Sequence, residues 1–209
     1  MVSLKPNGFQ ITLPDWWPPT FNESKNFILG MQEVVEDIYM ILYNPPHAKV
    51  LLSLEEISLL KQSVQNLLGI KCAGGDEQWY SQRRELLDDF SVFVPGHTVV
   101  YGKPLGANGS YSNVACLSPN GAVKIWDLIE KDYEKAQELE AKVLNFMKQY
   151  ILPFANKLSN TGLDKLLASV GGWGPVSEKV LWPYDGATAE DVKKIKIHAN
   201  NELEEILNV

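Results

Sequence analysis

A lysine inside an apolar segment and a glycine-rich turn before it are the features of this sequence that could do chemistry. Lys124 is the only charged residue in the segment 122–126, AVKIW, whose alternation predicts a strand. An ammonium group among apolar residues is destabilising unless it is paired or binds an anion. Gly106, Gly109 and the small Ser110 predict a turn that lies close over a ligand, because residues without bulk permit close backbone approach. Together these features favour a phosphate site.

Lys124 needs an acidic partner, and the segment that follows it provides one. Residues 130–150 place apolar side chains at helical intervals, which predicts an amphipathic helix. Glu140 lies at the edge of the apolar stripe, from which it can reach a neighbouring strand. We take Glu140 as the partner of Lys124, and Glu138 is close enough in the sequence to compete for the same role.

At these residues the sequence resembles the amino-terminal lobe of the protein-kinase superfamily, including its small-molecule phosphotransferases. In that family a glycine-rich hairpin covers the phosphates of ATP, a strand lysine holds them, and a helix glutamate fixes the lysine. The resemblance covers residues 99–207 and implies ATP as the cofactor. It makes Val114 the residue that packs on the adenine and places Tyr184 in the hinge beside it. The nucleotide-binding residues implied by the resemblance are Gly106, Gly109, Ser110, Val114, Lys124, Glu140 and Tyr184.

The sequence departs from the kinase pattern in ways that bear on activity. Ser112 stands where the last loop glycine is usual, and an extra residue separates Gly106 from Gly109. No histidine is followed by a catalytic-loop aspartate, and Asp185 with Gly186 comes too early to be the metal-binding pair. The predicted function is therefore an incomplete kinase-like module, a pseudokinase or part of a split kinase, that binds nucleotide or docks a partner and is not catalytic alone. The alternative is a non-enzymatic interaction or assembly protein without a nucleotide site.

Composition narrows the classes of function. The 209 residues, 45% hydrophobic and 22% charged, fit a globular protein with a sizeable core. A formal net charge of -7 argues against broad binding to nucleic acid or anionic lipid. The first residues lack a signal-peptide core, and no apolar run reaches the roughly 18 residues that a bilayer crossing needs. Cys72 and Cys116 lack metal-ligand spacing, which favours free thiols in a reducing compartment. We therefore expect a cytoplasmic protein with a protein partner, no metal, and no nucleic-acid or membrane binding.

The first half of the chain is expected to be helical. Residues 1–20 are predicted to form an extended arm, in which Trp16 and Trp17 either pack on the domain or dock a partner. Pro95 and Gly96 indicate a boundary, because the apolar period changes there from helical to alternating. The helices predicted before this boundary span residues 22–42, 53–68 and 76–90.

The second half is expected to complete a small sheet. Residues 166–170 and 180–184 are predicted strands of a hairpin, followed by a closing helix from Ala189 that Thr188 caps. The predicted fold class is α+β, with a small antiparallel sheet and flanking helices that resemble a kinase amino-terminal lobe. The predicted domains are the arm with the helical amino-terminal module, 1–95, and the lobe-like domain, 96–209.

Overall fold

The computed structural model describes residues 4 and 6–208 of the chain, and this part divides into two compact units. The sheet unit comprises the residues up to Val94 together with Gly102–Tyr111. The helical unit comprises Pro95–Tyr101 and the described residues from Ser112 onward. None of the helices in the described residues combines the length and the apolar character that a membrane crossing requires.

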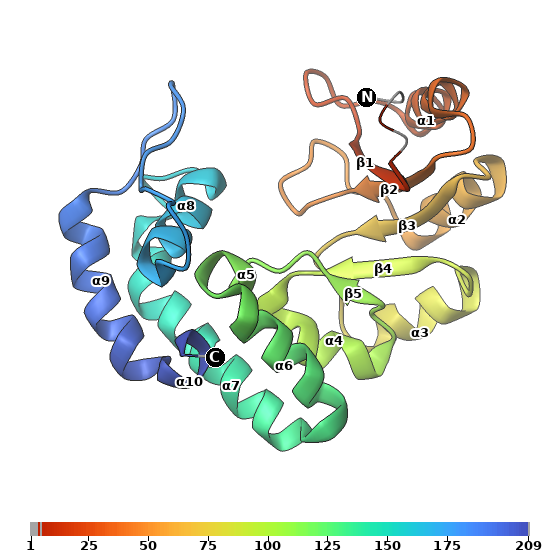
Figure 1. Cartoon of the computed structure of the whole chain (residues 1–209). Helices are drawn as coiled ribbons and strands as arrows, with labels where there is room; N and C mark the ends of the chain where they lie inside the picture. The colour runs from red at the N-terminus through yellow and green to blue at the C-terminus, as the bar shows by residue number, and fades with distance from the viewer. Residues whose placement is uncertain (1–3, 5, 209) are drawn as a thin grey trace. The chain divides into compact units, whose positions relative to one another are not determined.

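The sheet unit alternates strands and helices along the chain (Figure 1). Its strands pair in the order β1-β2-β3-β4-β5 among the described residues, and every neighbouring pair is parallel. Parallel strands need crossover connections, which α1, α2 and α3 supply. The elements are β1 (Gly8–Thr12), α1 (Phe21–Val35), β2 (Tyr39–Tyr43), α2 (Leu54–Ser63), β3 (Leu67–Lys71), α3 (Glu77–Leu86), β4 (Ser91–Val94), the part of α4 (Val99–Leu105) from Gly102 onward, and β5 (Gly109–Ser110). A 3-10 turn (Gly96–Thr98) and the first residues of α4 belong to the helical unit.

The two faces of the sheet differ in character. Helices α1, α2 and α3 lie together on one face (Figure 1). This face carries Leu42, Ile70 and Val92, which are partners across β2, β3 and β4 and are at most 2% exposed. Burying a side chain of this kind stabilises the fold by about 1.5–3 kcal/mol. The other face carries half-buried side chains, among them Tyr43 and Lys71, which are also partners in register.

Capping residues determine where the first helices begin and end. Thr20 and Glu23 form a capping box at the start of α1, and Ser53 and Glu56 form another at the start of α2. Glu36, immediately after α1, takes a φ of 54°. The helical path ends there, and the apolar residues that follow enter β2 as an extended strand.

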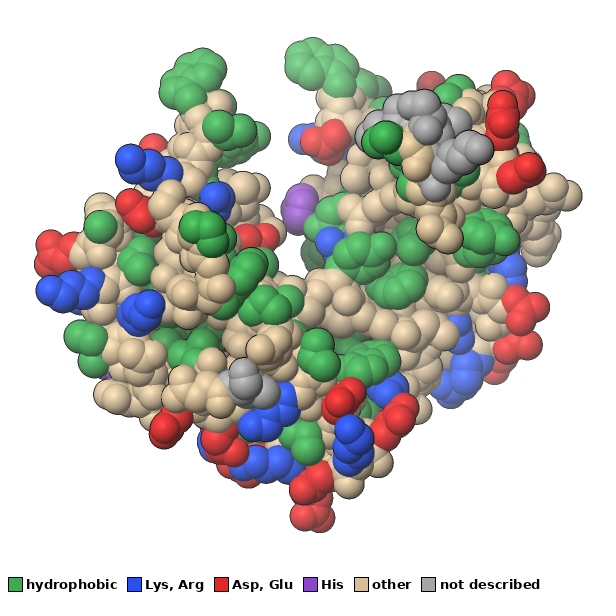
Figure 2. Space-filling view, in the orientation of Figure 1, with side chains coloured by type: hydrophobic (Ala, Val, Ile, Leu, Met, Phe, Trp, Pro, Cys, Tyr) green, Lys and Arg blue, Asp and Glu red, His purple; other side chains and the backbone are tan. Residues whose placement is uncertain are grey.

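The helical unit packs its helices around an apolar core that includes the fully buried Leu117, Leu139 and Phe146. Gly171 lets α8 approach α5 closely, because a Cβ there would lie 1.8 Å from the Leu117 carbonyl oxygen. Figure 2 shows acidic and basic side chains intermixed on the surface over α7 and α10. The elements of the helical unit after Ser112 are α5 (Val114–Leu117), α6 (Pro119–Lys131), α7 (Tyr133–Phe146), a π-helical turn (Met147–Ile151), a 3-10 turn (Leu152–Phe154), α8 (Asn160–Gly171), α9 (Ala189–Glu202) and α10 (Glu204–Leu207).

The predicted α+β fold with an antiparallel sheet is wrong. The strands are parallel, and β2 to β4 lie within the segment that was expected to be helical, whereas β1 lies in the predicted extended arm. The predicted helix 22–42 ends at Val35, and the residues at its end belong to β2. Periodicity alone cannot assign a short apolar run such as YMILY to a helix or to a buried strand.

The strands predicted for the second half are wrong, but two of its predicted helices are confirmed. The helix predicted at 130–150 is present as α7 and the π-helical turn that follows it. The predicted strand 122–126 lies within α6, and the predicted strand 166–170 lies within α8. Residues 180–184 contain turns and no strand. The closing helix is confirmed: α9 begins at Ala189, and the Thr188 side chain accepts a hydrogen bond from the Asp191 backbone.

Candidate active site

One row of side chains crosses the sheet at the carboxyl ends of the strands. The register pairs Thr12 with Tyr43, Tyr43 with Lys71, and Lys71 with Phe93. Residues in register on neighbouring strands point to the same face, so these side chains lie side by side on the face opposite α1, α2 and α3. In α/β sheets, ligands bind at the carboxyl ends of the strands. The row is therefore a candidate site.

Lys71 is the charged member of this row. It ends β3 after the apolar residues LLGI, and its side chain is half-buried. Its Nζ lies 4.0 Å from the ring centroid of Tyr43 and 5.0 Å from that of Tyr111. Both distances fall within the roughly 6 Å range of cation–π attraction. The sheet thus holds an amine between aromatic rings at the edge where α/β sheets bind their ligands.

Tyr111 directly follows β5 and is held in place by Phe93. The two rings meet edge to face, with centroids 5.3 Å apart and an interplanar angle of 78°. Gly109 makes room for this contact, because a Cβ there would lie 2.9 Å from two carbons of the Phe93 ring. The absence of a side chain at Gly109 therefore helps to position the ring that faces Lys71.

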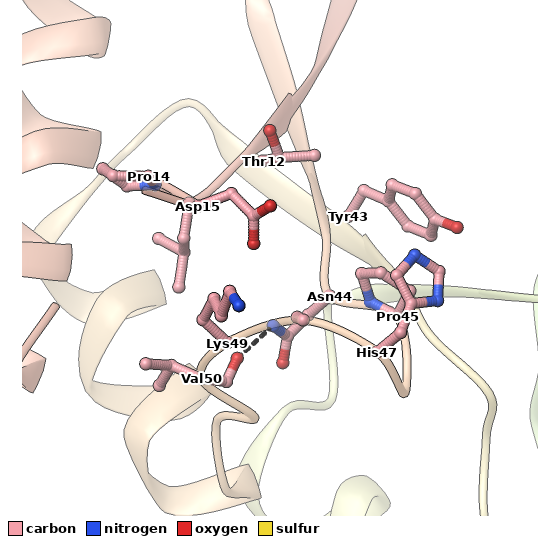
Figure 3. A pocket seen from close by; sticks show the side chains of 11 residues that line it. Thr12, Pro14, Asp15, Tyr43, Asn44, Pro45, His47, Lys49 and Val50 are labelled. Carbon is pink, nitrogen blue, oxygen red and sulfur yellow. Dashed lines mark hydrogen bonds between the residues drawn. The ribbon is translucent and has the colours of Figure 1, made fainter. Parts of the chain in front are cut away.

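A cavity of about 190 Å³ adjoins Tyr43, between the segments that follow β1 and β2. Figure 3 shows the side chains of Asp15 and Lys49 pointing toward one another across it. Asn44 shapes its floor: Nδ2 donates to the Val50 carbonyl at 2.7 Å, and Oδ1 accepts from the backbone of the same loop at 3.0 Å. The cavity therefore presents both a carboxylate and an ammonium group beside the aromatic partner of Lys71.

Cys72 directly follows Lys71 and is a second residue whose side chain can act as a nucleophile. Burial raises the pKa of the Cys72 thiol, so the thiol prevails at neutral pH and is a weak nucleophile. Its backbone N–H donates to the Phe93 carbonyl at 3.0 Å and continues the pairing of β3 with β4. Within residues 4 and 6–208, no three His, Cys, Asp or Glu side chains gather as metal ligands. Burial therefore does not favour Cys72 as a thiolate nucleophile.

The predicted Lys124–Glu140 pair does not form. Lys124 lies on α6, and its Nζ donates to the backbone carbonyl of Glu205 at 2.8 Å. The Glu140 carboxylate on α7 accepts from the Val100 backbone N–H at 2.9 Å, and burial raises its pKa. Glu138, the alternative partner, pairs instead with two lysines of its own helix.

The other residues implied by the kinase resemblance do not form a phosphate hairpin. Gly106 follows α4 with a φ of 120°, where glycine is favoured, and Gly109–Ser110 forms β5, which pairs in parallel with β4. Val114 is buried at the start of α5. Tyr184 is exposed, and its backbone N–H donates to the Leu181 carbonyl at 3.0 Å in a turn.

Sequence reasoning overlooked Lys71 and Tyr43, although a signal for the lysine was present. Lys71 is the only charged residue of LLGIK, the same pattern that drew attention to Lys124. The predicted helix 53–68 extended into β3, so the end of this strand was not considered as a site. Tyr43 had no signal of its own, because its position beside Lys71 depends on the register between β2 and β3.

Residues 7–197 match the sequence profile of the dihydrodipicolinate synthetase family. The chain belongs to this family. No curated protein sequence matches it, but solved structures share its fold. N-acetylneuraminate lyase from Fusobacterium nucleatum has 17% sequence identity and a TM-score of 0.78, over 96% of this chain and 67% of that chain.

Two further structures connect the fold to the dihydrodipicolinate synthetase family. Dihydrodipicolinate synthase from Bacteroides thetaiotaomicron has 19% identity and a TM-score of 0.74, over 93% of this chain and 66% of that one. A prophage protein of the family from E. coli K12, in complex with pyruvate, has 19% identity and a TM-score of 0.76, over 94% and 66%. This chain thus spans about two thirds of the length of these structures.

Membership in the dihydrodipicolinate synthetase family overturns the kinase interpretation. The predicted pseudokinase or docking module is wrong, and the ATP expected from it loses its basis. The parallel sheet with flanking helices matches the TIM-barrel-like fold of the aldolases in this group. Active sites of TIM-barrel enzymes lie at the carboxyl ends of the strands. Lys71 and Tyr43 occupy this end of β3 and β2.

Proposed function

We propose that the chain carries a lysine-dependent aldolase site, in which the Lys71 amine forms a Schiff base with a small 2-oxo acid. The observation that carries this proposal is the position of Lys71: its Nζ lies 4.0 Å from the Tyr43 ring centroid at the carboxyl end of a parallel sheet. Lysine amines form Schiff bases with carbonyl substrates. Pyruvate is the 2-oxo acid we propose, because a family member from E. coli K12 is described in complex with it.

The chemistry needs only groups that the row supplies. The neutral Lys71 amine attacks the keto carbon of the acid, forming a C–N bond, and the keto oxygen leaves as water to give an iminium ion. The Tyr43 hydroxyl, which gives a proton to the departing oxygen, can then as phenolate accept a proton from the neighbouring carbon, and this loss gives an enamine. In the synthetic direction this carbon attacks an aldehyde to form a new C–C bond; in the lyase direction that bond breaks. Hydrolysis of the final iminium returns the lysine.

Tyr43 is the residue best placed to assist Lys71. A phenol hydroxyl both donates and accepts a hydrogen bond, so it can hand a proton to the departing oxygen and take it back during hydrolysis. The ring also borders the cavity that contains Asp15 and Lys49. We assign this cavity to the second carbonyl compound, since a carboxylate and an ammonium group can hydrogen-bond hydroxyl or carboxyl groups of a substrate.

The free cysteine thiols support a proposal about the location of the protein in the cell. Cys72 and Cys116 are unpaired in the described part of the chain, as expected in a reducing compartment. We accordingly propose a cytoplasmic location, which fractionation of cells expressing the chain would test.

Borohydride trapping tests the proposed function. Sodium borohydride reduces an iminium ion to a stable secondary amine, so wild-type protein incubated with pyruvate and borohydride should gain the mass of one reduced pyruvate. Lys71→Arg keeps the charge but cannot form the iminium, and should gain nothing. Lys124→Arg, at the lysine chosen from the kinase pattern, is the matched control and should react as the wild type does. Equal labelling of wild type and Lys71→Arg would refute the proposal.

A further inference from the structure

The cavity beside Tyr43 has a negative group on one wall and a positive group on another, and this pairing bears on which aldehyde an aldolase would accept. We propose that the second substrate is a small uncharged hydroxyaldehyde, and that Asp15 and Lys49 select it over an aldehyde that carries a carboxylate. This inference rests on the proposed function, because it concerns the compound that the enamine on Lys71 attacks. Neither Asp15 nor Lys49 takes part in the lysine chemistry itself.

Asp15 and Lys49 reach the cavity from different segments of the sheet unit. Asp15 follows β1, Lys49 lies between β2 and α2, and both line the cavity. Figure 3 shows that the carboxylate and the ammonium group point into the space between the two segments. Among the described residues, neither group has an ion-pair partner. Both groups can therefore form hydrogen bonds with a bound molecule.

The two groups differ in the hydrogen bonds that they can form. The Asp15 carboxylate only accepts hydrogen bonds, and the Lys49 ammonium group only donates them. A hydroxyl group does both, so the hydroxyl groups of an aldehyde can donate to Asp15 and accept from Lys49. A carboxylate on the substrate can accept from Lys49, but it has no hydrogen to give to Asp15 and faces a group of the same charge. The cavity therefore favours a hydroxyaldehyde.

The volume and position of the cavity fit a three-carbon compound beside the lysine. The volume is about 190 Å³, somewhat larger than the roughly 150 Å³ cavity that holds a benzene molecule. Glyceraldehyde has as many non-hydrogen atoms as benzene. Tyr43 lines the cavity, and its ring centroid lies 4.0 Å from the Lys71 Nζ. Asn44 is buried, and its hydrogen bonds to Val50 and Leu52 hold the segment that carries Lys49 in place.

The experiment compares two aldehydes of equal size as acceptors for pyruvate. Glyceraldehyde is uncharged and carries hydroxyl groups, whereas 3-oxopropanoate has the same number of non-hydrogen atoms and carries a carboxylate. In both reactions the enamine carbon forms a bond to the aldehyde carbon, the aldehyde oxygen takes up a proton, and hydrolysis releases a six-carbon 4-hydroxy-2-oxo acid. Mass spectrometry of this acid gives kcat/KM for each aldehyde at saturating pyruvate.

The wild type should favour glyceraldehyde over 3-oxopropanoate. Like charges in contact disfavour a complex strongly, but Asp15 and Lys49 are exposed and solvent screens them, so we expect a preference of about tenfold or more in kcat/KM. Asp15→Asn keeps the shape of the side chain and removes its charge. This variant should lose most of the preference, mainly because kcat/KM for 3-oxopropanoate rises when Lys49 is no longer opposed.

Two further variants test the assignment of charge. Lys49→Met removes the attraction for a carboxylate and leaves Asp15 in place, so its kcat/KM for 3-oxopropanoate should fall below that of the wild type. Asp37→Asn is the matched control for Asp15→Asn. Asp37 is exposed and lies between α1 and the amino end of β2, at the opposite end of the strand from the row. Its substitution should leave kcat/KM for both aldehydes unchanged.

Trapping of pyruvate by borohydride without an aldehyde separates this inference from the proposed function. Wild type, Asp15→Asn and Lys49→Met should all trap pyruvate, because neither position contributes to the Schiff base. Absence of trapping in the wild type would refute the lysine chemistry itself. Three results would overturn only the role of Asp15 and Lys49: trapping without turnover of either aldehyde, a wild type that favours 3-oxopropanoate or shows no preference, or an Asp15→Asn variant with the wild-type preference.

Discussion

Gly69 provides a quantitative test of how β3 and β4 are packed. An alanine Cβ at this position would lie 2.6 Å from the backbone carbonyl oxygen of Ser91, its register partner on β4. Ordinary contact begins at 3.4 Å, so the atoms must separate by about 0.8 Å. A backbone oxygen in a paired strand cannot rotate away as a side chain can. Gly69→Ala should therefore push the two strands apart.

The expected size of the effect follows from two opposing terms. Overpacking of this kind costs about 1–3 kcal/mol, and the lower entropy of alanine in the unfolded chain offsets about 0.4–1 kcal/mol. The middle of the two ranges gives a net loss of about 1.3 kcal/mol, which for a chain of this size lowers the melting temperature by about 3–5 °C. Lys71 lies two residues further along β3, so trapping of pyruvate should fall as well.

Gly30→Ala is the matched control for Gly69→Ala. Gly30 lies in α1, and an added Cβ there has no atom within 4 Å. Alanine favours a helix over glycine by about 0.5–1 kcal/mol, so this variant should melt above the wild type. Thermal unfolding of the full chain, followed by circular dichroism, compares the three proteins. A Gly69→Ala protein that melts at or above the wild-type temperature would show that β3 and β4 are not packed as described.

Three further changes should alter stability in defined ways. Two lysines of α7 lower the pKa of Glu205 to about 2. The ionised carboxylate therefore stabilises the fold above its ordinary pKa of 4.5, and this stabilisation is lost as the pH falls toward 2. Glu205→Gln should flatten the dependence of melting temperature on pH in that window. Arg83 is buried and donates a hydrogen bond to the backbone carbonyl of Phe90, just before β4. Arg83→Met should therefore lower the free energy of unfolding, measured by urea titration, by about 1–3 kcal/mol. Arg84 is exposed, and Arg84→Met should change the free energy of unfolding less. Burial raises the pKa of Glu140, so the free energy of unfolding of the wild type falls as the pH rises through that raised pKa. Glu140→Gln should remove this fall, because the amide oxygen has no charge to bury and can still accept the hydrogen bond from the Val100 N–H. Glu140→Ala loses that hydrogen bond and should lower the melting temperature at every pH.

The local signals in the sequence predicted helix starts better than they predicted the fold. A helix was predicted to start at residue 53 and another after the Thr188 cap, and α2 and α9 begin directly after Ser53 and Thr188. Capping depends on residues within one turn of each other, so the sequence contains the whole signal. Whether strands pair in parallel depends on how distant segments meet. The apolar runs of β2 and β3 carry no such information, and they were assigned to helices.

The candidate site likewise depends on how distant segments of the chain meet. A single cation in an apolar strand is destabilising unless it is paired or binds an anion, but Lys124, which the sequence pattern indicated, lies in a segment that folds as the amphipathic helix α6. Lys71 meets the condition because β3 is a strand and its other residues are apolar. Its aromatic neighbours come from β2 and from the residue after β5. Only the register of the sheet brings these residues together.

If Lys71 is the nucleophile, the group trapped by borohydride must be attached to the Lys71 Nζ. Wild-type chain reduced with borohydride in the presence of pyruvate would be digested, and its peptides sequenced by mass spectrometry. The account predicts one modified residue per chain, at Lys71. Modification of a different lysine, or of none, would contradict it.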